Sequence, residues 1–405
     1  MTNLSRRTVL AGLAGASATA LAAPHVRPAG ATPGVTDTEI LLGQTMPYSG
    51  GASGYADWGR AEVAYFEMIN AQGGINGRHV RLISLDDGLS PPKTVEQTRR
   101  MVERDGVLAL FGSFATSPNS AIHRYVNSRG VPHLFLASGA SKWADPENYP
   151  WTMGWLPDYP TEAKVYAQYI MENDPDATAS IFYQNDDGGR DFYEGFKAGF
   201  GDQVDRYLVG EQTFEATDPT VDAQIANLQQ SGANYLFIIG QPRTMAQAIR
   251  GSYDSGWRPN LMINAGSASV SGTLEPAGLD KAAGIMSVAF VKDPTDDTWA
   301  DDPGFLAWSA FMDEWFPKGR KSDVNTVYGY CMAQTMEQVL RQCGDDLSRE
   351  NVMAQAANLR DLALPMLLPG VTINTAPDDY RPIEAMRLQR FNGAKWELFG
   401  DTIGG

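Results

Sequence analysis

The chain has 405 residues but only two cysteines, so it is not a small domain held together by a disulfide framework. Its 41 glycines are too few for collagen, which needs one residue in three. Lys and Arg number 32 against 48 Asp and Glu, for a net charge of −16. Nucleic acids and anionic membranes attract clustered basic residues, so this deficit argues against both as partners. With 43% hydrophobic residues, the length predicts two globular domains.

The motifs of common enzymes are also missing. The sequence contains no G-x-S-x-G, H-E-x-x-H, C-x-x-C or G-x-x-x-x-G-K-[ST] motif, and the glycine-rich run at 50–54 predicts a tight turn. His79, His123 and His133 lie beside or inside regular elements, which favours structural roles. The acidic stretch 293–302 lacks EF-hand spacing and predicts a solvated loop. We therefore expect neither an enzyme nor a bound metal or cofactor.

The two cysteines are too far apart to bond to each other. Cys331 and Cys343 both fall in a helical-looking run at 325–344. A rise of about 1.5 Å per residue separates them by roughly 18 Å, whereas a disulfide needs Cα atoms within about 7 Å. The spacing predicts two buried free thiols in one helix.

The first 31 residues predict an export signal. Arg6 and Arg7 form a twin-arginine run before an apolar stretch rich in Ala, Gly and Leu, with small-residue cleavage sequences at 20–22 and 29–31. A membrane anchor is the alternative, but the stretch is shorter than the roughly 20 residues that span a bilayer. We expect a cleaved twin-arginine signal at 1–31, no membrane insertion afterwards, a periplasmic or extracellular location, and a mature net charge of −19.

The rest of the chain alternates short apolar runs with amphipathic segments, a pattern typical of parallel sheets covered by helices. The first block predicts strands at 40–46, 79–85, 107–111 and 131–137 and helices at 57–71, 92–104 and from Ser117, as N-cap, to Gly130. After a proline- and aromatic-rich stretch at 146–160, the second block predicts strands at 180–184, 207–214, 234–240, 261–264 and 284–291 and helices at 161–173, 190–199, 221–232 and 244–255.

Three helices and a hairpin complete the pattern. The helices are predicted near 303–316, 325–343 and 348–362, and the hairpin spans 384–399 with a two-residue turn at Asn392-Gly393. We expect an α/β fold of two doubly wound parallel-sheet lobes, with the binding cleft between them.

Hydroxyl and glycine residues follow two neighbouring predicted strands. They are Ser113, Thr116 and Ser117 after the first strand, and Ser138, Gly139, Ala140 and Ser141 after the second. For one segment alone, ordinary helix capping is the commoner role. Two such segments in one lobe indicate a carboxylate clamp, because hydroxyls, unpaired backbone N–H groups and a helix dipole all favour an anion.

A specific motif follows the first predicted helix, at Asn70-Ala71-Gln72-Gly73-Gly74-Ile75-Asn76-Gly77-Arg78, and weaker ones follow in order at Asp86-Asp87, Pro91, Asp105-Gly106-Val107 and Thr116-Ser117. With them the chain, from about 40 to 399, resembles the leucine/isoleucine/valine-binding family of ABC-importer substrate-binding proteins. The resemblance implies a type I periplasmic binding protein. Three crossovers would join an N-terminal lobe of 32–157 plus 292–381 to a C-terminal lobe of 158–291 plus 382–405.

The resemblance also implies roles for matching positions. Thr116 or Ser117 offers a hydroxyl to a ligand carboxylate, and the segment 138–140 adds backbone amides. Tyr55 forms an aromatic wall. Gly188, in Asn185-Asp186-Asp187-Gly188-Gly189, replaces an aromatic residue of the family, and this change should enlarge the pocket.

Other departures bear on the ligand. Gln241 stands where amino-acid binders often have tyrosine, and Asn264 lies where an acidic residue usually holds the α-ammonium group. A buried ammonium without a carboxylate partner is costly, so this loss argues against an α-amino acid. Asp158 is either a substitute for that charge or a helix cap. Trp151, Trp155 and Tyr159 are either stacking partners of an aromatic ligand or hinge packing.

The sequence therefore predicts a monomeric binding protein for a small carboxylic acid, aromatic or branched aliphatic, with a branched-chain amino acid still open. It would close around the ligand and present it to an inner-membrane ABC permease with its ATPases. The alternatives are an amide or urea binder, a periplasmic sensor subunit of the same fold, and a hydrolase with a base near Ser117 or Ser138.

Overall fold

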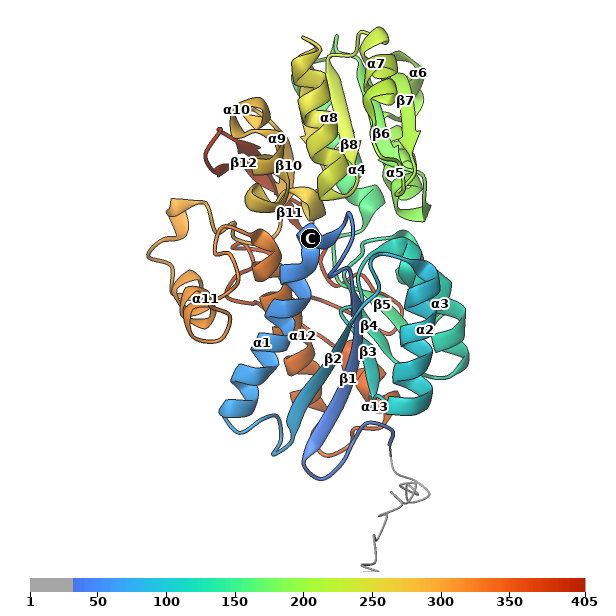
Figure 1. Ribbon diagram of the computed structural model, residues 1–405, viewed down its shortest axis with the longest axis vertical. Helices are drawn as coiled ribbons and strands as arrows, with labels where there is room; N and C mark the ends of the chain where they lie inside the picture. Colours follow the sequence, from blue (N-terminus) through green and yellow to red (C-terminus); the bar gives the residue numbers. More distant parts are fainter. Residues whose placement is uncertain (1–31, 405) are drawn as a thin grey trace, which may run out of the picture. The chain divides into compact units, whose positions relative to one another are not determined.

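The computed structural model describes residues 32–404, so the predicted export signal lies outside the described residues. Two sheets flanked by helices form two lobes (Figure 1). The first sheet is parallel, with the strand order β2-β1-β3-β4-β5. Its strands are β1 (Glu39–Met46), β2 (His79–Asp86), β3 (Ala109–Phe111), β4 (His133–Leu136) and β5 (Thr152–Gly154). Its first helices are α1 (Ala56–Ala71), α2 (Pro91–Arg99) and α3 (Thr116–Ser128).

The second sheet has seven strands in the order β12-β11-β10-β9-β8-β6-β7. They are β6 (Ala179–Gln184), β7 (Leu208–Phe214), β8 (Tyr235–Ile239), β9 (Asn260–Ile263), β10 (Met286–Ala289), β11 (Met386–Phe391) and β12 (Trp396–Ile403). The last two form an antiparallel hairpin at one edge. The helices are α4 (Tyr159–Asn173), α5 (Asp187–Phe200), α6 (Val204–Tyr207), α7 (Asp222–Gln230), α8 (Pro242–Asp254), α9 (Glu275–Ala277) and α10 (Leu279–Ala282).

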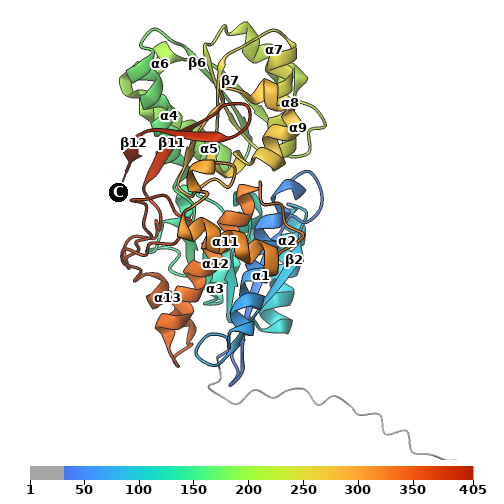
Figure 2. The same ribbon diagram turned by 90° about the vertical axis from the view of Figure 1, so that its left-hand side faces the viewer.

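Three further helices return to the first sheet although they follow the second in sequence. They are α11 (Pro303–Glu314), α12 (Val324–Cys343) and α13 (Arg349–Ala356). The long α12 packs against α1, and Figure 2 shows α11, α12 and α13 in the same lobe as α1. The chain therefore passes between the lobes three times, after β5, after β10 and after α13.

Burial explains why the sheets form. Every residue of β4 and of β8 is buried, as expected for central strands of a parallel sheet covered on both faces. On α12 most residues are buried, including Cys331 and Cys343, which are both free. The predicted α/β class with two parallel-sheet lobes is confirmed. The predicted lobe boundaries at 157, 291 and 381 stay a prediction.

Three local predictions were wrong. Helix α3 begins at Thr116 and not after a Ser117 cap, because Ala115 precedes it with a φ of 67° and no side chain caps it. The hairpin loop has four residues, 392–395, since Asn392 Oδ1 accepts hydrogen bonds from the backbone of Ala394 and Lys395. Strand β5 lies in the proline- and aromatic-rich stretch, where no strand was predicted.

Candidate functional site

A pocket lies between the two lobes, where loops follow the carboxyl ends of strands from both sheets. Its volume is about 650 Å³, including its open mouth. The first lobe contributes Tyr55, Trp58, Leu89, Phe114, Ala115, Thr116 and Ala137. The crossover and the second lobe contribute Leu156, Tyr159, Gln184, Asp186, Gly188, Gly189, Phe192, Ile239, Gly240, Gln241, Asn264 and Gly266.

The first lobe presents the start of α3 to the pocket. Thr116 is the first residue of this 13-residue helix, and no side chain caps the helix. The first-turn N–H groups of an α-helix have no acceptor within the helix, and its dipole favours negative charge at this end. The Thr116 hydroxyl lies 2.8 Å from the Ser138 hydroxyl, which holds it in place. This corner of the pocket can therefore receive an anion.

The second lobe presents a chain of amides that ends at a carboxyl group. Gln241 Nε2 donates to Gln184 Oε1 at 2.9 Å, and Gln184 Nε2 donates to Asp186 Oδ2 at 2.7 Å. Asp186 also caps α5, because its Oδ1 accepts a hydrogen bond from the backbone N–H of Gly189 at 2.9 Å. Burial raises the pKa of Asp186 above its ordinary value. The pocket thus contains one partly buried acidic group.

Asn264 lies on the same wall, in the turn after β9. Its side chain is buried, with 9% exposed, and its Oδ1 has no hydrogen-bond partner among the described residues. A buried acceptor without a donor is costly, so such groups in native proteins call for an explanation. Because Asn264 lines the pocket, a donor on a bound ligand is the natural partner for this oxygen.

Glu162 of α4 holds this turn from behind without lining the pocket. Its Oε1 accepts a hydrogen bond from the backbone N–H of Ala265 at 2.7 Å and lies 3.1 Å from the Tyr166 hydroxyl. That hydroxyl donates both to Glu162 Oε1 and, at 2.8 Å, to the carbonyl of Ile263, so it shares its hydrogen between the two oxygens. Burial raises the pKa of Glu162 to about 7, against the opposing effect of the hydrogen bonds from Ala265 and Tyr166.

The remaining walls are mainly aromatic. The rings of Tyr55 and Phe114 lie 4.6 Å apart, and those of Tyr159 and Phe192 stack at 4.2 Å. The Tyr55 hydroxyl lies 3.0 Å from the Ser267 hydroxyl, so this residue of the first lobe also touches the second. Such walls suit the apolar body of a ligand, whose orientation the few polar groups would set.

Polar contacts also join the two lobes directly. Lys142 Nζ lies 2.6 Å from Asp187 Oδ2. The backbone N–H and the hydroxyl of Ser141 donate to the two carboxylate oxygens of Asp191 at 2.7 and 3.0 Å. Asp187 and Asp191 belong to α5, whereas Ser141 and Lys142 follow β4, so these bonds join one lobe to the other.

Gly188 lines the pocket, and the enlargement expected from its missing side chain stays a prediction. A Cβ on Gly188 would lie 2.8 Å from Thr116 Oγ1 and 3.4 Å from the Tyr159 ring. These two side chains therefore stand against the position of the first side-chain carbon of any larger residue. The missing side chain at Gly188 lets the second lobe approach the start of α3 closely.

The predicted site residues divide between two cavities, except Ser117, which lines neither of them. Tyr55, Thr116, Gly188, Gln241 and Asn264 line the pocket between the lobes. Ser138, Gly139, Ala140 and Asp158 instead line a second cavity, together with the segment 378–382. Their roles stay predictions.

Asp158 and Ser138 have structural partners. Asp158 caps α4 by accepting hydrogen bonds from the backbone N–H and the hydroxyl of Thr161, which matches the capping alternative. Ser138 Oγ accepts a hydrogen bond from Trp143 Nε1 at 2.8 Å. The hydrogen bonds of Ser138 among the described residues include no His, Lys or carboxylate, so they supply no base.

Sequence reasoning missed several lining residues, above all Gln184 and Asp186. Gln184 ends the strand β6 and Asp186 follows it, and this position at a strand end is the signal that identified Thr116. Of the three aromatic residues in the crossover, Tyr159 lines the pocket, whereas Trp155 is fully buried and donates to Thr335 Oγ1 at 3.0 Å. Trp151 lies at a separate surface groove.

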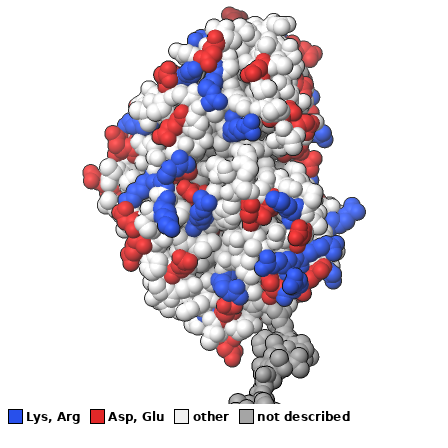
Figure 3. Space-filling model, viewed as in Figure 1, with Lys and Arg blue, Asp and Glu red and all other residues white. Residues whose placement is uncertain are grey.

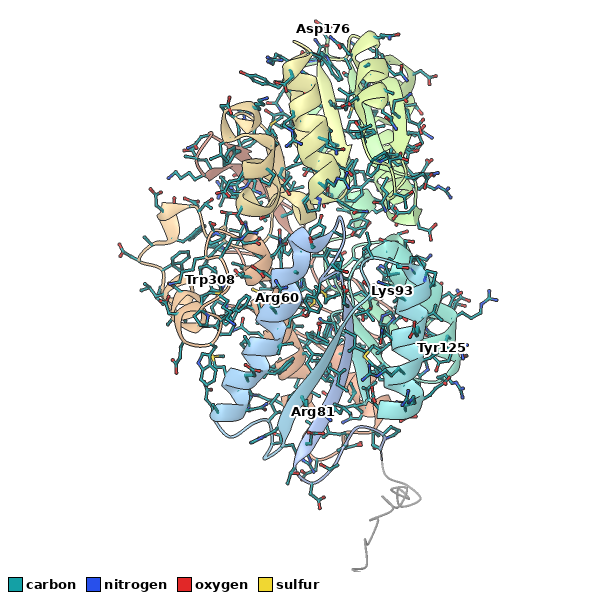
Figure 4. All side chains as sticks on the ribbon, viewed as in Figure 1. Arg60, Arg81, Lys93, Tyr125, Asp176 and Trp308 are labelled. Carbon is teal, nitrogen blue, oxygen red and sulfur yellow. The ribbon has the colours of Figure 1, made fainter. Side chains whose placement is uncertain are left out.

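Positive charge lies outside the pocket. None of the described residues that line it is Lys, Arg or His. Basic side chains gather instead over α2 and α3 (Figure 3), the helices on which Figure 4 labels Lys93 and Tyr125. The exposed ones there are Lys93, Arg99, Arg100, Arg104, Arg124 and Arg129. A ligand anion would therefore be held by dipoles and not by a cation.

The described part of the chain offers no alternative chemistry that is better supported. Within residues 32–404 no group of three or more His, Cys, Asp or Glu side chains is arranged to hold a metal ion. His123 and His133 are buried, and burial lowers the pKa of each, to about 4 and about 3. In the same range, no helix has both the length and the apolar character to cross a membrane.

Comparison with known proteins gives consistent similarities. A family model described as periplasmic binding protein matches residues 39–395. Leu/Ile/Val-binding protein homolog 7 of Brucella abortus is 22% identical over 274 residues, which cover 65% of this chain and 67% of that protein. A branched chain amino acid ABC transporter structure from Thermus thermophilus, with bound valine, aligns with a TM-score of 0.80 at 16% identity, covering 92% of this chain and 98% of that one. A fatty acid ABC transporter substrate-binding protein from Thermomonospora curvata aligns at 0.74 and 18% identity, covering 92% and 94%.

Proposed function

Because the chain belongs to the periplasmic binding protein family, we propose that it captures a small carboxylic acid for an ABC importer. The resemblance to Leu/Ile/Val-binding proteins and the type I periplasmic binding protein fold are confirmed. Members of this family bind small molecules outside the cytoplasm and work with ABC permeases. The acid has an aromatic or branched aliphatic body, which the aromatic walls of the pocket enclose.

The observation that carries this proposal is the uncapped start of α3 at one corner of a partly aromatic pocket. Thr116 begins α3 without a side-chain cap, as do α1, α2, α7 and α8, whereas α4, α5, α11, α12 and α13 have one; α3 adds a hydroxyl of its own at the pocket. The free N–H groups and the Thr116 hydroxyl supply the donors that a carboxylate needs. Closure of the second lobe then removes water from this contact and strengthens it.

The position of Asp186 bears on whether the ligand can carry an amino group. The sequence argument against an α-amino acid depended on the lack of an acidic group in the pocket, but Asp186 lines it. Its two oxygens already accept hydrogen bonds from Gly189 and Gln184. A carboxylate oxygen accepts more than one hydrogen bond, so a ligand ammonium has a partner there. The proposed ligands therefore include branched-chain amino acids.

An amide or urea ligand is the second candidate. The side-chain amides of Gln184, Gln241 and Asn264 all lie on the wall formed by the second lobe. Amide groups pair with neutral donors and acceptors as readily as with a carboxylate. A ligand without charge would use this wall and leave the start of α3 to water.

The cellular setting follows from the same proposal. Arg6 and Arg7 support export by the twin-arginine route. The mature protein would act as a monomer that presents its ligand to an inner-membrane permease with its ATPases. A sensor subunit would use the same pocket but signal to a receptor, and the genes beside this one distinguish the two roles.

Isothermal titration calorimetry of the protein lacking residues 1–31 tests the proposal. The panel contains benzoates, phenylpropanoids, short-chain acids, branched-chain amino acids and their primary amides. We expect at least one acid to bind with a micromolar or lower Kd, and small-angle X-ray scattering to show a more compact protein once it is bound. Binding of amides alone would favour the second candidate, and binding of neither class would contradict both.

A further inference from the structure

The unpartnered oxygen of Asn264 says something about the ligand beyond its carboxylate. Asn264 Oδ1 is buried, lines the pocket, and accepts no hydrogen bond from any described residue. The neighbouring amides of Gln184 and Gln241 each have a partner, so Asn264 is the exception on this wall. Since a buried acceptor that stays unpaired is costly, it marks the place where the ligand must supply an N–H or O–H group.

The sheet places Asn264 away from the proposed carboxylate site. Asn264 follows β9, and Gly188 follows β6, with β8 between these strands. Neighbouring strands lie about 4.8 Å apart, so the two strand ends are separated by about 10 Å. Gly188, shortly after β6, touches Thr116. The proposed carboxylate site therefore lies on the β6 side of the pocket. The donor that Asn264 needs therefore belongs to the opposite end of the ligand.

The surroundings of Asn264 indicate that this donor carries no charge. The nearest acidic group behind the turn, Glu162, is directed to the Ala265 N–H and the Tyr166 hydroxyl and does not line the pocket. Asp186 lies at the β6 end, two strands away. An ammonium group at Asn264 would thus be buried without a carboxylate partner, whereas a hydroxyl or amide N–H would not be.

We propose that the ligand is a carboxylic acid with an uncharged hydrogen-bond donor, a hydroxyl or an amide N–H, at the end opposite its carboxylate, and that Asn264 selects for this donor. This inference rests on the proposed function, because it takes the start of α3 as the carboxylate site. It separates the preferred ligands from plain aliphatic or aromatic acids. Such acids would leave Asn264 Oδ1 buried and unpaired, and they would bind roughly 5- to 100-fold more weakly.

Matched ligand pairs test the inference by calorimetry. Each pair consists of an acid and its analogue with a terminal hydroxyl: benzoate and 4-hydroxybenzoate, cinnamate and 4-hydroxycinnamate, valerate and 5-hydroxyvalerate. In the wild-type protein we expect the hydroxyl analogue of at least one pair to bind at least ~5-fold more tightly. In Asn264→Leu, which keeps the volume but removes the amide, that preference should disappear or reverse.

A second variant keeps the test informative if Asn264→Leu fails to fold. Asn264→Asp places a carboxylate at the same point and should shift preference from 4-hydroxybenzoate towards 4-(aminomethyl)benzoate, which carries an ammonium group there. Circular dichroism melts check that each variant is folded. An unchanged hydroxyl preference in both variants, or equal binding of both members of every pair to the wild type, overturns the role of Asn264 while the acid-binding function stands. If no acid binds at all, the proposed function fails and this inference with it.

Discussion

Gly188 of the second lobe lies directly against Thr116 of the first, so that a Cβ on the glycine would stand 2.8 Å from the threonine Oγ1. Real Cβ atoms do not approach other atoms so closely, and the contact joins the two lobes at the proposed carboxylate site. The absence of a side chain at position 188 is therefore a condition for closure. It sets how near the second lobe can come to the start of α3.

Gly188→Ala should therefore hinder closure. We expect ligand affinity to fall about 3- to 10-fold, because the added methyl group must displace Thr116 or hold the lobes apart. Calorimetry measures the affinity, and small-angle X-ray scattering measures compaction on binding. The control is Gly251→Ala in α8, where a Cβ meets nothing nearer than 3.6 Å, at Ile225. Equal affinities for the two variants would refute the closure argument.

The bonds between Ser141 and Asp191 should stabilise the closed form. In Asp191→Asn one of the two carboxylate acceptors becomes an NH₂ group, so one of the two hydrogen bonds from Ser141 is lost. The expected loss is about 1 kcal/mol, or about 5-fold in ligand affinity. Glu194→Gln is the matched control on the same helix, since Glu194 pairs with Lys197 within its own lobe. A similar loss in both variants would mean that the effect is not due to contact between lobes.

Glu162 should make stability depend on pH. Burial raises its pKa from 4.5 to about 7, so the folded protein holds this proton over a range in which the unfolded chain has released it. The free energy of unfolding should therefore fall as pH rises from about 4.5 to 7, and Glu162 should account for about 1–3 kcal/mol of the fall. Urea titrations at several pH values measure it. Asp293 and Asp323, whose pKa values burial raises to about 6, act in the same direction in the wild type and in Glu162→Gln. Over this pH range the free energy of unfolding of Glu162→Gln should fall less than that of the wild type. An identical pH dependence in the two proteins would contradict the raised pKa of Glu162.

The two cysteines should be inert in the folded protein. Cys331 is fully buried, burial raises its pKa, and burial raises the pKa of Cys343 to about 12. The thiolate is the reactive form, so neither residue should react with Ellman's reagent at pH 8 within minutes. In 6 M guanidinium chloride both should react at once. A fast-reacting thiol in the native protein would show that α12 is less well packed than the structure indicates.

Sequence patterns predicted the parts of the fold that depend on local regularities. The largely apolar segments that became β4 and β8 identify central strands without any knowledge of their neighbours. The start of α3 was misplaced because Ser117-Pro118 is a good local cap signal, whereas the real boundary depends on the backbone of Ala115, whose φ is 67°. Such a conformation is set by the loops that meet at the pocket and not by residue type.

In the pocket, too, sequence patterns predicted what depends on neighbouring residues and missed the contacts made by residues far away in the chain. Thr116 was identified because it follows a predicted strand, and Gln241 and Asn264 were identified by resemblance to the family; all three line the pocket. The contact between Gly188 and Thr116 was not predictable, since Thr116 comes from the other lobe. Ser138 also follows a strand, but its hydroxyl is taken by Trp143, a contact that no spacing rule reveals.

The central claim is that the start of α3 holds a carboxylate, and one titration tests it most directly. The best acid of the panel and its primary amide are each titrated into the wild-type protein and into Thr116→Val. We predict that the acid binds the wild type at least ~10-fold more tightly than the amide does. We also predict that Thr116→Val weakens binding of the acid several-fold more than binding of the amide. An amide that binds the wild type as tightly as its acid would contradict the account.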